Sequence, residues 1–92
     1  MIDEITWQNF EHYLNNVNEG YLVNVWLSQR SAKAHNLAHI SGTCTATLNT
    51  NDPVNYPKFF ASTLQEAKEY ALQRYAVPYE SCTSCEQCDR HG

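Results

Sequence analysis

The feature that most constrains the fold is an alternation of small apolar and hydroxyl side chains between His39 and Asn49. The apolar positions are Ile40, Gly42, Cys44, Ala46 and Leu48, and the hydroxyl positions are Ser41, Thr43, Thr45 and Thr47. A period of two predicts a β-strand with one buried and one solvated face, as antiparallel sheets have. We therefore predict a strand over 39–49, with Cys44 as a small buried hydrophobe on its apolar face.

Two shorter runs rich in β-branched and aromatic residues, 21–28 and 57–61, predict the other strands of this sheet. Pro57 has no N–H to donate, so it places the later strand at a sheet edge or stands as that strand's first residue. The segment 29–37 is polar and lacks apolar periodicity, which is typical of a wide hairpin loop. The expected sheet thus has three antiparallel strands, over 21–28, 39–49 and 57–61.

Two amphipathic helices are predicted beside the sheet. The first spans 6–18, is capped by Thr6, and carries an apolar stripe of Trp7, Phe10, Leu14 and Val17. The second spans 63–76, follows overlapping capping signatures at Ser62 and Thr63, and ends before Pro78. Packing both helices on one face of the sheet is the simplest way to bury both stripes. The predicted fold class is therefore α+β, with both helices on the same face.

The chain is short enough for one domain, which we place at 1–78, followed by a Cys-rich C-terminal tail at 79–92. The start of the chain has no basic segment followed by an apolar one, and no apolar run approaches the roughly 20 residues of a membrane span. We expect a cytoplasmic protein that does not contact a membrane. A disulfide framework is disfavoured there, because the cytosol keeps thiols reduced.

The tail holds the sharpest local pattern, in which Cys82, Cys85, Cys88 and His91 are each three residues apart. Zinc prefers thiolate and imidazole ligands, and a CxxC turn presents two sulfurs to one ion. However, structural zinc sites usually join two separated ligand pairs, and the chain has no second CxxC pair. We therefore expect no required cofactor, and we keep zinc held by these four residues as an alternative.

The net charge of −4 disfavours free DNA as a partner, because nucleic acid repels an acidic protein. A basic stretch without acids includes Arg30, Lys33, His35 and Asn36, and its cations could meet phosphates or carboxylates. Residues 1–20 hold four acids, among them Glu11 in the first predicted helix, and no Lys or Arg. Trp26 is a surplus aromatic suited to an interface. No nucleophile-plus-base spacing, phosphate-binding loop or carboxylate pair is recognisable, so we expect a binding protein and not an enzyme.

As a whole, the chain resembles small phage-encoded anti-CRISPR proteins, in particular inhibitors of type I-F surveillance complexes. The resemblance rests on the acidic opening MIDEITWQNFEHYLNN, the hydroxyl-lined segment HISGTCTATLNT and the capped helix FFASTLQEAKEYALQRYA. The resemblance concerns the general character of the whole sequence, and we infer no individual binding residue from it. The cysteine-rich tail departs from most of these proteins.

The resemblance implies a stoichiometric inhibitor in an infected bacterial cell, bound to the subunits of a crRNA-guided complex and blocking target DNA. The partners would be CRISPR effector proteins, with guide-RNA phosphates close to Arg30 and Lys33. The alternative, from the tail, is a small zinc-binding protein-interaction module. Partner contact is expected through Arg30, Lys33, His35, Asn36, Glu11 and Trp26.

Overall fold

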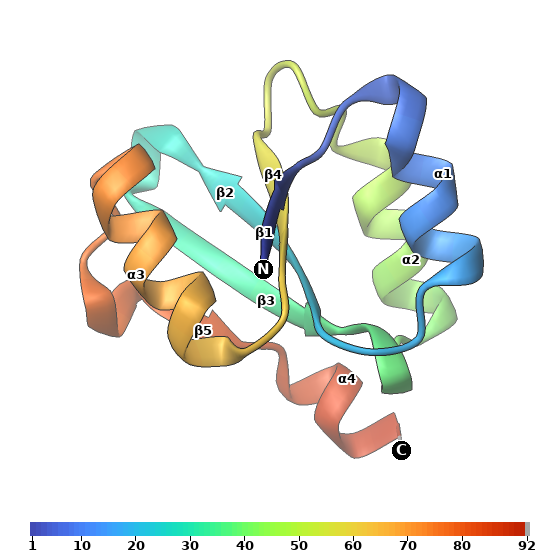
Figure 1. The fold of residues 1–92 in the computed structure, drawn as a ribbon. Helices are drawn as coiled ribbons and strands as arrows, with labels where there is room; N and C mark the ends of the chain where they lie inside the picture. Colours follow the sequence, from blue (N-terminus) through green and yellow to red (C-terminus); the bar gives the residue numbers. More distant parts are fainter. Residues whose placement is uncertain (92) are drawn as a thin grey trace.

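The computed structural model describes residues 1–91 as an α+β fold built on one five-stranded mixed sheet (Figure 1). The strands are β1 (Ile2–Glu4), β2 (Tyr21–Trp26), β3 (Ser31–Asn36), β4 (Lys58–Ala61) and β5 (Cys82–Ser84). The helices are α1 (Trp7–Asn16), α2 (Gly42–Thr50), α3 (Leu64–Tyr75) and α4 (Glu86–His91). The strand order is β1-β4-β2-β3-β5, and the β3–β5 pair is parallel while the other pairs are antiparallel. The α+β class is confirmed, but the sheet has more strands than predicted and is not purely antiparallel.

The predicted strand over 39–49 is wrong, because this segment forms a 3₁₀ turn (Leu37–His39) and then helix α2. The Ser41 hydroxyl caps the helix by accepting from the Cys44 N–H at 3.1 Å. Cys44 and Leu48, four residues apart, are both buried on one face of the helix. Two residues four positions apart lie on the same face of a strand, which has a period of 2, and on nearly the same face of a helix, which has a period of 3.6. The spacing of Cys44 and Leu48 is therefore compatible with either structure.

The predicted loop over 29–37 is also wrong, because its residues form β3, paired along its whole length with β2. Arg30 lies in the tight connection between the two strands, with a left-handed φ of 50°. The small side chains of Ala32 and Ala34 alternate with Lys33 and His35, so β3 has an apolar face and a polar one. Because alanine is small and only weakly apolar, the sequence pattern of this strand resembles that of a polar loop.

The remaining predicted elements are close to the observed ones. Helices 6–18 and 63–76 correspond to α1 and α3, with Thr6 and Thr63 as their caps. The strand predicted over 57–61 is β4, which lies inside the sheet between β1 and β2 and begins just after Pro57. In α1, Trp7 is 61% exposed and does not join the buried stripe, whereas Tyr13 does.

The prediction of two helices on one face is wrong, because helices cover both faces of the sheet (Figure 1). Helix α3 packs through Ala67 and Ala71 on the face formed by Val23, Val25 and Phe59. Helices α1 and α2 pack on the opposite face, around Leu22 and Phe60. Two small cores therefore lie on opposite faces of one sheet. The side chains at odd-numbered positions of β3 lie on the face that α1 and α2 cover.

The segment expected as a tail from residue 79 onward belongs to the fold. It forms a 3₁₀ turn (Tyr79–Ser81), strand β5 and helix α4. Cys82 is fully buried against the α3 face, and Lys68 of α3 donates to the Cys82 carbonyl at 2.6 Å. The C-terminal segment is thereby held beside β3. Over residues 1–91, no helix has the length and hydropathy that crossing a membrane requires.

Candidate metal centre

Four potential metal ligands from separate parts of the chain converge beside the end of the sheet: His35, Cys44, Cys85 and Cys88. Their ligand atoms all lie within 4.8 Å of one another, and all four residues are buried. Such a cluster could hold a metal ion such as zinc.

The fold explains why these residues meet. His35 projects from β3 toward α2, because Ala34 before it points into the opposite core. Cys44 lies in the first turn of α2, which begins shortly after β3 ends. The parallel pairing of β5 with β3 continues to Cys85, whose N–H donates to the Ala34 carbonyl at 2.8 Å, and α4 then supplies Cys88. The metal cluster therefore depends on the β3–β5 pairing.

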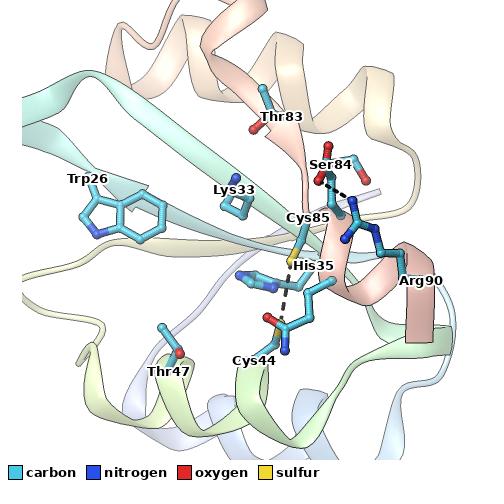
Figure 2. A pocket seen from close by; sticks show the side chains of 11 residues that line it. Trp26, Lys33, His35, Cys44, Thr47, Thr83, Ser84, Cys85 and Arg90 are labelled. Atoms are coloured by element: carbon cyan, nitrogen blue, oxygen red, sulfur yellow. Dashed lines mark hydrogen bonds and ion pairs between the residues drawn. The ribbon is translucent and has the colours of Figure 1, made fainter. Parts of the chain in front are cut away.

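Two of the distances between donor atoms in the cluster suit tetrahedral coordination. The Cys44 and Cys85 sulfurs lie 3.6 Å apart, and Figure 2 shows this pair joined by a dashed line. The Cys88 sulfur lies 3.5 Å from Nδ1 of His35. Zinc bonds of about 2.0–2.3 Å to nitrogen and sulfur imply ligand–ligand separations of roughly 3.5–3.8 Å in a tetrahedron. The Cys44–Cys85 and Cys88–His35 pairs thus have the separations of a zinc tetrahedron, and all four donor atoms lie within 4.8 Å of one another.

The protonation of His35 also suits a ligand. Burial is the main cause that lowers the pKa of His35 from 6.5 to about 4, and the positive charges of Lys33 and Lys58 lower it further. The imidazole is therefore neutral near pH 7, and a neutral ring nitrogen is the form that binds a metal.

The two cysteines of the CxxC pair differ in acidity. Burial opposes ionisation of Cys85, but N–H donation from Cys88 and Gln87 and contacts with the other two thiols outweigh it, so the pKa of Cys85 is lowered. Burial, together with hydrogen bonds to Cys44 and Cys85, raises the pKa of Cys88 to about 12. Cys85 is therefore the first of these two thiols to become a thiolate, which is the form that binds zinc.

The predicted metal residues are only partly brought together. Cys85 and Cys88 belong to the cluster, whereas Cys82 lies in the core on the opposite face of the sheet. The side chain of His91 lies outside what the structure describes. His35 and Cys44 complete the cluster instead, and they were missed because their segments were predicted as a loop and a strand. His39, four residues after His35, is exposed.

A cleft of about 730 Å³ borders the cluster and is lined by three of the predicted partner-binding residues, Trp26, Lys33 and His35 (Figure 2). Its lining is Trp26, Lys33, His35, Cys44, Thr47, Thr83, Ser84, Cys85, Glu86, Gln87 and Arg90. Trp26 and Lys33 thus lie next to the metal cluster, where His35 serves as a ligand candidate.

The other predicted partner residues lie elsewhere. Arg30 is exposed in the β2–β3 connection, and Asn36 caps the turn after β3 by accepting from the Ala38 N–H at 3.0 Å. Glu11 is exposed on α1 beside a smaller groove that also contains Phe10. The structure therefore does not gather the predicted partner residues into one surface.

Comparisons with known proteins identify no relative: no family model, curated protein or solved structure matches this chain. The inhibitor function suggested by the resemblance to anti-CRISPR proteins stays a prediction.

Proposed function

We propose that this chain is a zinc-binding protein-interaction module in which one Cys₃His centre fastens the C-terminal segment to the domain. The observation that carries the proposal is the convergence of His35, Cys44, Cys85 and Cys88, with all ligand atoms within 4.8 Å. Three soft thiolates with one imidazole favour zinc over magnesium or calcium, which prefer oxygen ligands.

Four protein ligands make the centre structural and not catalytic. Catalytic zinc sites use three protein ligands and keep one position for water or substrate, whereas structural sites are closed by four. Here the fourth ligand is present, and Cys88 is fully buried. The function then lies in the surface that the zinc holds in place.

That surface is the cleft beside the centre. The sheet contributes Trp26 from β2, Lys33 from β3 and the residue paired with it in β5, Thr83, and α4 borders the cleft with Arg90 (Figure 2). Aromatic and cationic side chains are common anchors of protein interfaces. Because α4 is fastened through Cys88, loss of the zinc should open the cleft on this side.

The test is native mass spectrometry of the purified chain, with metal identity from elemental analysis. We expect one zinc per chain, lost in Cys44→Ser, Cys85→Ser and Cys88→Ser and retained in Cys82→Ala. Cys82 is the matched control, because it is equally buried but lies on the other side of the sheet. A metal-free chain, or zinc lost only with Cys82→Ala, would refute the proposal.

A further inference from the structure

The thiols of the centre differ in their access to solvent. Cys44 and Cys85 line the cleft, are 4% and 7% exposed, and are its only lining cysteines, whereas Cys88 is fully buried and is not part of the lining. The cleft around them is polar, with Lys33, Thr47 and Gln87 among its residues. A small polar molecule in the cleft therefore lies beside Cys44 and Cys85 and not beside Cys88.

The two accessible sulfurs are also close together. Their separation is 3.6 Å, and a disulfide bond needs about 2.05 Å, so the sulfurs must approach each other by roughly 1.5 Å. Cys85 lies in the short connection between β5 and α4, and Cys44 lies in the first turn of α2. Both positions are at the ends of elements, where a shift of this size disturbs less packing than in the middle of a helix.

We infer that Cys44 and Cys85 form an oxidation site for hydroperoxides, through which the zinc centre is opened. The inference rests on the proposed zinc function and adds a regulation of the same site. It assigns separate roles to the three cysteines: Cys44 and Cys85 react, and Cys88 is a ligand only.

The chemistry consumes one peroxide for each pair of thiolates. The Cys85 thiolate attacks hydrogen peroxide, an S–O bond forms, the O–O bond breaks and hydroxide leaves, which gives a sulfenic acid. The Cys44 thiolate then attacks that sulfur, an S–S bond forms and a second hydroxide leaves. Two electrons pass from the sulfurs to the peroxide, and the zinc stays divalent.

The zinc is released because it loses two of its four ligands. His35 and Cys88 alone do not form a closed tetrahedral site. The disulfide still joins α2 to the β5–α4 connection, but α4 loses the attachment through Cys88. A thiol reductant would restore both thiolates and allow zinc to bind again.

The experiment treats the zinc-loaded full-length chain with hydrogen peroxide and follows zinc release with a chromophoric chelator. We expect zinc release, a mass loss of two hydrogens, and a Cys44–Cys85 disulfide in peptide mapping, with Cys82 left reduced. Two matched variants keep a four-ligand set. Cys44→His should slow release by about tenfold or more, because the accessible pair is gone, whereas Cys88→His should not slow it.

The outcomes separate this inference from the proposed function. Zinc that binds but is not released by peroxide, or a mapped Cys85–Cys88 disulfide, overturns the oxidation site and leaves the zinc function standing. A chain that binds no zinc overturns both. If a variant fails to load zinc, disulfide mapping of the unaltered chain still decides the assignment.

Discussion

Removal of zinc should strongly lower the thermal stability of this chain. The centre joins β3, α2 and the C-terminal segment, and its Cys44–Cys85 link spans 41 positions of sequence. Without zinc, the C-terminal segment is held by non-covalent contacts such as the short β3–β5 pairing, the contact of Cys82 with the core and the hydrogen bonds of Lys68.

The size of the effect follows from zinc binding to the folded chain and not to the unfolded one. At a free zinc concentration about 1,000 times Kd, this binding stabilises the fold by about 4 kcal/mol. A domain of this size has a total unfolding free energy of roughly 5–14 kcal/mol. Each kcal/mol shifts the melting temperature by about 4–8 °C, so the expected decrease is about 15–30 °C.

The assay is thermal unfolding followed by circular dichroism, with and without a zinc chelator. Cys82→Ala should show the same decrease on chelation as the unaltered chain, whereas Cys44→Ser should show none, because its centre is already broken. An unchanged melting temperature in protein whose zinc loss is verified by mass would show that the centre does not stabilise the fold.

Three further predictions concern acid, packing and the C-terminal segment. In the folded chain the pKa of His35 is lowered from 6.5 to about 4. Between pH 6.5 and pH 4 the unfolded chain therefore binds more protons than the folded chain. The metal-free chain should lose up to about 3 kcal/mol of unfolding free energy as the pH falls through this range. Urea unfolding at several pH values in this range measures the loss, and His35→Gln should make the unfolding free energy less dependent on pH. Leu48 is fully buried, whereas Leu64 is only partly buried. In urea unfolding, Leu48→Ala should lower the unfolding free energy by about 2–5 kcal/mol, and Leu64→Ala should lower it clearly less. Equal decreases would contradict the assigned burial. Truncation after Tyr79 should abolish cooperative unfolding, because it removes β5 and two ligands; an intact melting transition in the truncated chain would show that the segment is dispensable.

Those elements that depend on neighbouring residues could be predicted from the sequence. Thr6 and Thr63 cap α1 and α3 through hydrogen bonds to residues two or three positions later, so the signal lies within a few residues. The strands β2 and β4 contain enough large apolar residues, such as Val23 and Phe59, to be recognised as strands from the sequence. In each case a short stretch of sequence contains the physical cause of the structure.

Segment 39–49 shows where local pattern fails. Cys44 and Leu48 satisfy a strand and a helix equally, and the choice between them depends on what covers the sheet beside Leu22 and Phe60. Thr45 and Thr47 then donate their hydroxyls to carbonyls four residues back, which a helix allows and an alternating pattern does not reveal. Tertiary packing decided this element.

The candidate metal centre depends even more on tertiary structure. The sequence by itself showed that Cys85 and Cys88 are spaced as a ligand pair, because a CxxC turn is local. It did not show that His35 and Cys44 complete the set, or that Cys82 turns into the opposite core. Those assignments follow from the parallel pairing of β3 with β5, which joins residues about 50 positions apart and leaves no trace in any short stretch of the chain.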